Sequence, residues 1–217
     1  MKCLKKLLLN LRTGRGAGDV SSPFLGWKLI KPSKDGFIYW HIVNFTDRMN
    51  KSAVIQNFVE VYDIWQNEMD KSDPEGVMVK YRSTSDYEKA HIHIVFVKPG
   101  KLIQKITGQD GTPRTFYLPE KMDGPGGVLA YVPRNQHIIF FDESENWSDM
   151  KGGSLDRISL FDVAMHENGH IHDLNHSEDK RSFMNAYSDG WTKQITAADR
   201  KNMRTVLSAI KRLMING

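Results

Sequence analysis

The chain has 217 residues, a formal net charge of +4 and one cysteine, Cys3. This length suits a single domain with a sizeable core, and one cysteine excludes an internal disulfide. Residues 1–34 hold eight Lys or Arg and one Asp, a net of +7, which leaves −3 for the rest. Because phosphate recognition needs a clustered basic surface, the globular part is not expected to bind nucleic acid.

Residues 1–23 are expected to form a basic, flexible N-terminal tail, and residues 24–217 a single domain. The apolar run at 7–9 is shorter than the roughly seven apolar residues that a secretory signal requires, so no signal peptide is predicted. No window approaches about eighteen uninterrupted apolar residues, so no transmembrane span is predicted.

The central part of the sequence predicts alternating strands and helices. FIYWHIV at 37–43 is rich in aromatic and β-branched residues, as strands are. Apolar residues at helical spacing then predict an amphipathic helix over 50–69. Further strands are expected at 77–82, 91–97 and 136–142.

Two more helices complete the expected fold. One spans about 156–172, and the last opens at Thr196 with Asp199 three residues on, an acidic variant of the capping box. This order of elements predicts an α+β domain with a small twisted mixed sheet. The last helix is expected to bury Met203, Val206, Leu207, Ile210 and Leu213.

The segment HENGHIHDLNHS, residues 166–177, carries the chemistry. His166 and His170 are four residues apart, so on a helix both imidazoles can reach one ion. Glu167 then suits a general base rather than a ligand. A continued helix would carry His176 about 15 Å beyond His166, so the helix must end near residue 173 for His176 to bind zinc.

The residue at that corner is Asp173. The chain must reverse there, and a left-handed backbone conformation is expected, for which glycine is the least strained residue and Asp or Asn are tolerated. Strain of roughly 1 kcal/mol is small against zinc-binding energies on the order of 10 kcal/mol, so the ion is still expected to bind.

This motif, with Met184 eight residues after His176, resembles the zinc-binding segment and Met-turn of the metzincins, and specifically of the matrixins. DGPGGVLAY and FFDESENW resemble the central loop region of the matrixin catalytic domain, and the likeness covers roughly residues 27–213. It implies a metzincin-like fold and a zinc endopeptidase, in which Met184 forms the floor beneath the metal. Extracellular action and binding of protein inhibitors are implied only by the resemblance, and a monomer is expected.

The resemblance also implies a calcium site. Its ligands map onto the carboxylates of Asp123, Asp142 and Glu145 and the backbone carbonyls near Gly124, Gly126 and Val128. Oxygen donors of this kind suit a hard cation such as calcium.

A structural zinc, in contrast, is not expected. The positions that hold it in matrixins become Phe116, Leu118, Tyr131 and Phe140, which lack imidazole and carboxylate groups. These side chains are expected to form a small hydrophobic plug, and His137 is the one neighbour that could still offer a ligand. Cys3 stands among Lys and Leu, so no cysteine-switch latency is expected.

An extended polypeptide is the expected substrate, added to an edge strand at Val128, Leu129 and Ala130. The selectivity pocket would follow Met184, with Tyr187 in its wall, but the proline that matrixins carry there is absent. A catalytically weak zinc-binding module that holds an extended polypeptide or inhibitor is the alternative, motivated by this altered wall and by Asp173.

The remaining histidines are not expected to be ligands. His91 and His93 alternate along a strand and share one face, so a half-buried or surface position is expected for them and for His41. His172 follows His170 by two residues, points away from the metal on a helix, and is expected to be exposed or to line the cleft.

Overall fold

A computed structural model describes residues 5–6, 22–72, 80–151, 156–188 and 193–215. Its main sheet has the strand order β3-β2-β4-β8-β7. The first four strands are parallel, and β7 pairs antiparallel with β8 at one edge. Their bounds are β2 Phe37–Ile42, β3 Lys80–Ser83, β4 Ile92–Val97, β7 Ala130–Tyr131 and β8 Ile138–Asp142.

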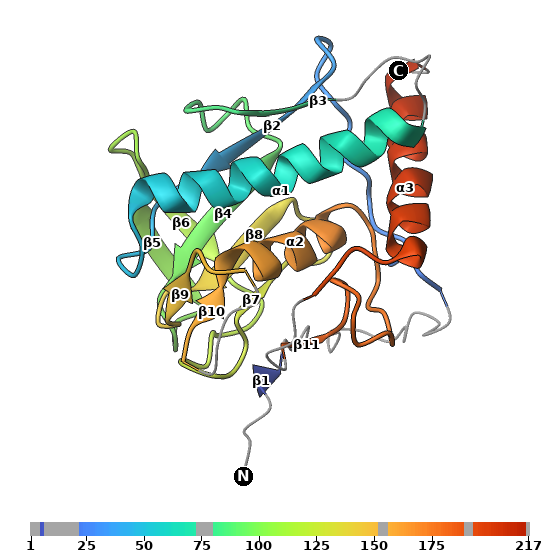
Figure 1. The fold of residues 1–217 in the computed structure, drawn as a ribbon. Helices are drawn as coiled ribbons and strands as arrows, with labels where there is room; N and C mark the ends of the chain where they lie inside the picture. The colour runs from blue at the N-terminus through green and yellow to red at the C-terminus, as the bar shows by residue number, and fades with distance from the viewer. Residues whose placement is uncertain (1–4, 7–21, 73–79, 152–155, 189–192, 216–217) are drawn as a thin grey trace.

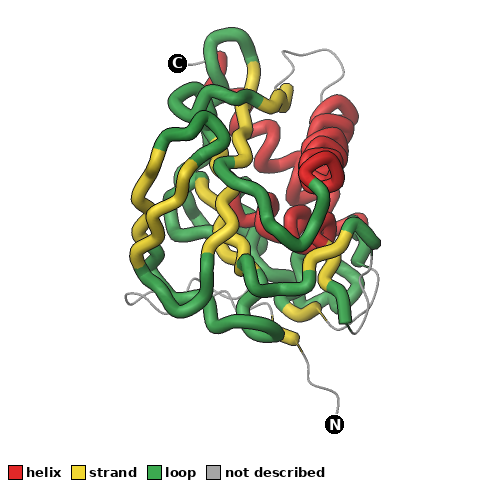
Figure 2. The backbone as a smooth tube through the Cα atoms, turned by 90° about the vertical axis from the view of Figure 1, so that its left-hand side faces the viewer, coloured by secondary structure: helices red, strands yellow, loops and turns green. Residues whose placement is uncertain are grey.

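Three helices accompany this sheet: α1 Lys51–Ser72, α2 Leu160–Ile171 and α3 Ala197–Ile215. In Figure 1, α1 and α2 lie across the same face of the sheet, and α3 stands beside the end of α1. Figure 2 shows most of the strands on one side of the molecule and most of the helical turns on the other, with short strands below the helices. The α+β class with a small mixed sheet, predicted from the sequence, is therefore confirmed.

The sheet separates two apolar clusters because side chains alternate between its faces. Ile94, Phe96, Ile139 and Phe141 face the helices and join the larger core. Val95, Val97 and Phe140, at the alternate positions, join a smaller cluster on the opposite face. A two-stranded hairpin, β5 Ile103–Thr107 and β6 Pro113–Tyr117, contributes Phe116 to that second cluster.

The predicted elements differ from the structure mainly at their ends. The strand expected at 136–142 begins at Ile138, and part of the one expected at 77–82 falls outside the described residues. Helix α2 begins four residues later than expected, because Ser159 caps it by accepting the Asp162 N–H. In the last helix Leu213 is 39% exposed, so its predicted burial is wrong, whereas the other four predicted residues are buried.

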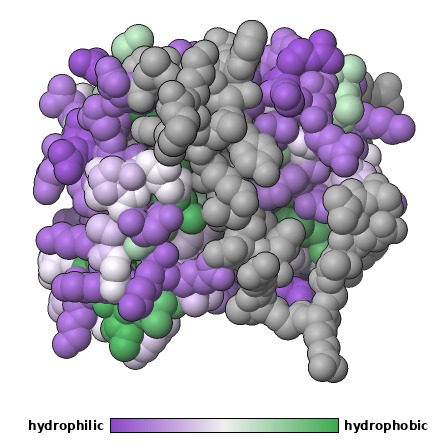
Figure 3. All heavy atoms as spheres, turned by 90° about the horizontal axis from the view of Figure 1, so that it is seen from below, coloured by the Kyte–Doolittle hydropathy of each residue, from purple (hydrophilic) through white to green (hydrophobic). Residues whose placement is uncertain are grey.

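Short strands join the outlying segments. Strand β9 Trp147–Ser148 pairs with β10 Ile158–Ser159, and β1 Lys5–Lys6 pairs with β11 Tyr187–Ser188. The rest of the predicted tail up to residue 21 lies outside the described residues. The described surface seen from below is largely hydrophilic (Figure 3). No described helix is both long and apolar enough to cross a membrane.

Candidate metal centre

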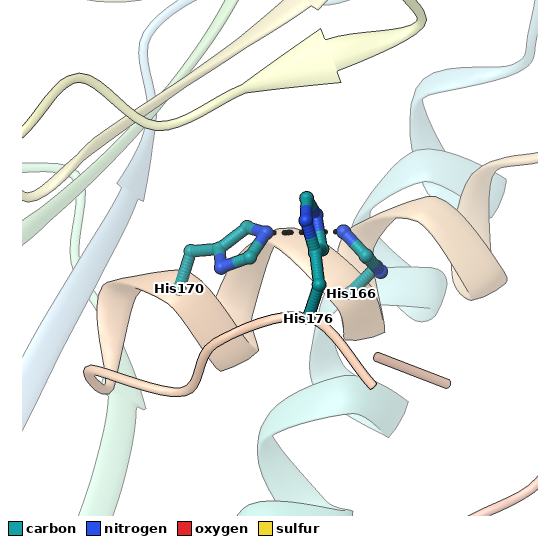
Figure 4. Close-up of side chains that lie close together, drawn as sticks. All are labelled: His166, His170 and His176. Atoms are coloured by element: carbon teal, nitrogen blue, oxygen red, sulfur yellow. Dashed lines mark hydrogen bonds between the residues drawn. The ribbon is translucent and has the colours of Figure 1, made fainter. Parts of the chain in front are cut away.

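Three histidine side chains converge on one point beside α2 (Figure 4). His166 and His170 project from the helix, and His176 approaches from the loop that follows it. One ring nitrogen from each lies within 4.8 Å of the others, and the Nε2 atoms of His166 and His170 are 3.1 Å apart. In the described part of the chain this is the one cluster of three or more potential ligands that meets such a distance.

Backbone carbonyls fix the tautomers of two of these rings. The Nδ1 of His166 lies 2.8 Å from the Phe183 carbonyl oxygen, and the Nδ1 of His170 lies 2.8 Å from that of Leu174. A carbonyl only accepts, so each Nδ1 carries the proton and donates it. Each Nε2 therefore presents a lone pair, and two lone pairs 3.1 Å apart repel unless a cation lies between them.

Burial keeps the three rings neutral. It lowers the pKa of His170 to about 3 and that of His176 to about 4, and it holds the pKa of His166 well below its usual range. Neighbouring histidines lower the pKa values of His166 and His170 further. Neutral imidazole is the form that binds a metal, so ligation requires no deprotonation near neutral pH.

The donor set fits zinc. Two nitrogens at about 2.1 Å from a tetrahedral zinc ion are about 3.4 Å apart, close to the observed separation in this cluster. The Nε2 of His176 is buried without a hydrogen-bond partner among the described residues, which leaves its lone pair for the same ion. Three imidazoles leave one coordination position open, as in catalytic rather than structural zinc sites.

The chain reversal that delivers His176 occurs where the sequence predicted it. Helix α2 ends at Ile171, and Asp173 adopts φ 67°, so its predicted left-handed conformation is confirmed. The N–H of Leu174 then donates to the Gly169 carbonyl at 2.8 Å and closes the helix end.

Glu167 lies next to the first histidine and is 1% exposed. Burial raises its pKa to about 8, and its Oε2 has no hydrogen-bond partner among the described residues. A bound cation would favour the carboxylate form and lower this pKa again. Burial and a bound cation thus act on this pKa in opposite directions.

Met184 lies against the metal-binding helix at Gly169. A Cβ at Gly169 would stand 2.1 Å from the Met184 Sδ, so only glycine permits this approach. The role of Met184 as a floor beneath the metal stays a prediction. Sequence reasoning missed the role of Gly169, because nothing local shows which side chain packs there.

The expected exposure of His172 is wrong. The ring is fully buried, stacks on Trp65 with centroids 4.2 Å apart, and its Nε2 lies 2.8 Å from the Tyr81 hydroxyl. It does point away from the metal, as predicted. His41 is also buried rather than half-buried, whereas His91 and His93 are half-buried as expected.

The predicted calcium region is assembled, but its carboxylates contact backbone amides. The N–H groups of Gly124, Gly126 and Val128 donate to Asp142, Glu145 and Asp123 at 3.1, 2.6 and 2.7 Å. The loop and the end of β8 are therefore adjacent, as the resemblance implied. Calcium binding here stays a prediction.

The four positions expected to form a hydrophobic plug do so. Phe116, Leu118, Tyr131 and Phe140 are all buried in the smaller apolar cluster. Phe140 contacts both other aromatic rings, with centroids 6.1 Å from Phe116 and 5.6 Å from Tyr131. His137 lies elsewhere, with its Nε2 3.0 Å from the Lys28 carbonyl oxygen.

The residues expected to bind substrate lie at the sheet edge and in the short outlying strands. Ala130 opens β7, the last strand of the main sheet, and among described residues no strand pairs with its outer edge. Leu129 accepts a hydrogen bond from the Asp142 N–H at 2.9 Å. Tyr187 belongs to β11, whose backbone pairs with Lys6.

The fold and the three-histidine centre define a metzincin-like domain. The family model for matrixins matches residues 32–207. The chain is 30% identical over 167 residues to human matrix metalloproteinase-26, which covers 74% of this chain and 53% of the relative. Macrophage metalloelastase of Oryctolagus cuniculus is 28% identical over 78% of this chain and 32% of its own length.

A shorter match, 42% identical over 71 residues, reaches the hatching enzyme of Paracentrotus lividus and covers 32% of this chain and 11% of that protein. The chain spans about half or less of the length of these relatives. The chain belongs to the matrixin family.

Proposed function

We propose that the chain is a zinc endopeptidase that cleaves extended polypeptides. The observation that carries this proposal is the convergence of three imidazoles, two of them with an unprotonated Nε2, while the buried Glu167 follows the first of them in the sequence. Zinc, when bound, would polarise the substrate carbonyl and lower the pKa of a water molecule. His166, His170 and His176 would hold the ion.

Glu167 would supply the proton transfers. Its carboxylate takes a proton from the attacking water and then gives that proton to the departing amine. Water is the nucleophile, so this route forms no acyl-enzyme. The open edge of β7 would bind the substrate as an added strand, with main-chain hydrogen bonds from around Leu129 and Ala130.

The proposal extends to calcium binding between the loop of Asp123 and the end of β8. It also includes action outside the cell, recognition by protein inhibitors and a monomeric state. These extensions are supported by the family and, for calcium, by the adjacency of the two segments.

The test compares the zinc-loaded protein with Glu167→Gln on a peptide library and on denatured collagen. The proposal is supported if the zinc-loaded wild type cleaves peptides and Glu167→Gln cleaves them at least about a hundredfold more slowly. Equal zinc content in both proteins is the control, because Glu167 ligates nothing. Failure of the zinc-loaded wild type to cleave any peptide would contradict it.

The second candidate is a zinc-binding module that holds a polypeptide without cleaving it. The pairing of β1 with β11 favours it, because that backbone pairing occupies the segment expected to form the pocket wall. Tight peptide binding that is unchanged in Glu167→Gln, without turnover in either protein, would support this candidate.

A further inference from the structure

Residues 22–28 run along the corner between the second and third histidines. They pair antiparallel with residues 173–175, which connect His170 to His176. The Leu25 N–H donates to the Asp173 carbonyl at 2.8 Å, and Phe24 forms a β-bridge with Leu174. Asn175 donates its backbone N–H to the Pro23 carbonyl at 2.8 Å and its side-chain amide to the Ser22 carbonyl at 3.1 Å.

The Asp173 carboxylate adds a contact that glycine could not make. Its Oδ1 accepts the Trp27 N–H at 2.6 Å. Gly26 has φ 71°, which turns the chain so that consecutive amides face the carboxylate. Burial raises the pKa of Asp173, and the amides of Trp27, Gly26 and Leu25 oppose that shift. The half-buried side chain thus lies against the segment that it binds.

The same corner orients a metal ligand. The Leu174 carbonyl that accepts the His170 Nδ1 proton belongs to the residue bridged to Phe24. The Asp173 N–H donates to the His170 carbonyl at 3.0 Å, and the Trp27 ring lies 6.5 Å from the His170 ring. Displacing residues 22–28 would therefore release the carbonyl that fixes the His170 tautomer.

We propose that Asp173 is a positioning residue whose carboxylate docks residues 22–28 on this corner and thereby holds His170 and His176 in place for zinc. The inference rests on the proposed zinc site. If Asp173 served only to adopt a left-handed backbone, glycine would do so with less strain and the carboxylate would contribute nothing.

Docking and zinc binding are then coupled, and the coupling is reciprocal. Loss of docking weakens zinc binding, and zinc binding must strengthen docking by the same factor. This relation makes the proposal testable in the wild-type protein as well as in variants.

The chain offers a matched control for the variant Asp173→Gly. Asn135 has φ 57°, and its Oδ1 accepts the Lys28 N–H at 3.0 Å, one residue beyond Trp27. Asn135→Gly therefore also replaces a left-handed residue and removes one side-chain bond to the same segment, but at its last residue and not at Asp173. It lies away from the corner that carries the ligands.

Zinc affinity is measured by competition with a chromophoric chelator, together with the visible spectrum of the cobalt-substituted protein. We expect Asp173→Gly to weaken zinc binding about tenfold or more and to alter the cobalt spectrum. Asp173→Asn keeps an acceptor oxygen and should stay within about threefold of the wild type. Asn135→Gly should match the wild type.

If the wild type binds zinc and Asp173→Gly binds it as tightly as Asn135→Gly does, the inference is overturned. If the wild type binds no zinc, the proposed zinc site is overturned instead. Should Asp173→Gly fail to fold, hydrogen exchange of the wild-type Trp27 and Leu25 amides decides. Zinc must slow their exchange about tenfold or more, and unchanged exchange would refute the coupling.

Discussion

The Met184 sulfur occupies the space that a side chain at Gly169 would need. A Cβ at Gly169 would stand 2.1 Å from Sδ and 2.8 Å from Cε of Met184, and 3.3 Å from a ring carbon of Phe183. The carbonyl of Phe183 in turn accepts the His166 Nδ1 proton. The packing of one helical glycine therefore bears on the orientation of a metal ligand.

Gly169→Ala should for this reason destabilise the zinc-free domain by about 1–3 kcal/mol, as overpacking of a close-packed interior does. The better helix propensity of alanine, about 1 kcal/mol, offsets only part of that loss. Denaturant unfolding measures the effect. The double variant with Met184→Ala should recover part of it, and additive losses in the two single variants would show that the contact is not strained.

Two ion pairs to one buried carboxylate join α1 to α3, and both arginine side chains are partly exposed. Glu68 is 1% exposed and pairs with Arg200 and, at 3.2 Å, with Arg204. Glu68→Gln should lower the free energy of unfolding by about 1–3 kcal/mol, since charge-assisted bonds to a buried acceptor are lost. On the same helix, Glu60 pairs with Lys151 at the surface, and Glu60→Gln should cost less than about 1 kcal/mol. Equal losses in the two variants would contradict the prediction.

The start of α3 could be predicted from the sequence because its signal is local. The Thr196 N–H donates to Asp199 at 2.8 Å, and the Asp199 N–H donates to the Thr196 hydroxyl at 3.2 Å, which completes the predicted capping box. The left-handed corner at Asp173 followed in the same way from a distance constraint between two ligands. Spacing and turn chemistry were sufficient in both cases.

Other features depend on partners distant in sequence. His172 is buried because Trp65 and Tyr81 reach it from α1 and β3, and no pattern around His172 indicates this. The β5–β6 hairpin was missed although the Asp110-Gly111 pair between its strands is a turn signal. Its strands are largely exposed and lack the apolar alternation on which strand prediction depends.

The chain should bind one zinc ion rather than two, because an apolar cluster around Phe140 stands where matrixins hold the structural ion. Metal analysis should find about one zinc per wild-type chain and none in His166→Ala/His170→Ala. His137→Ala should keep one, because that ring faces the Lys28 carbonyl. A zinc ion retained by the double variant would reveal a second site.

His93 should make stability depend on pH. Burial lowers its pKa below 6.5, and nearby His41, Arg114 and His91 lower it further, against the effect of a hydrogen bond to the Tyr87 carbonyl. Just below pH 6.5, His93 is protonated in the unfolded chain but still largely neutral in the folded chain. The free energy of unfolding therefore falls as pH decreases, by at most about 1.4 kcal/mol per pH unit for this group.

His93→Gln keeps a donor for the Tyr87 carbonyl but cannot titrate. The stability of the zinc-free wild type relative to this variant should decline between pH 7 and pH 5, as measured by denaturant unfolding. The histidines that do not interact with His93 titrate alike in both proteins, so their effects cancel in the comparison. A constant difference over this range would show that His93 titrates normally when folded.

Asp199 connects the helix cap of α3 to the Met-turn. Besides capping the helix at Thr196, its buried carboxylate accepts the Ser182 hydroxyl proton at 2.7 Å, and the Ser182 oxygen accepts the Met184 N–H at 2.9 Å. Asp199→Ala removes the acceptor from the whole chain of bonds and leaves buried donors unsatisfied. The expected loss of unfolding free energy is about 2–4 kcal/mol.

Asp199→Asn separates the charge from the geometry, because its amide oxygen still accepts one bond and its amide nitrogen can donate to the Ser182 oxygen. The loss of unfolding free energy in Asp199→Asn should be about half or less of the loss in Asp199→Ala. Because the Met184 N–H remains bonded only while Ser182 stays in place, zinc affinity should fall in the alanine variant and much less in the asparagine variant. Denaturant unfolding of the zinc-free proteins measures stability, and chelator competition measures zinc affinity. A loss of stability without any change in zinc affinity would show that the Met-turn is held independently of the helix cap.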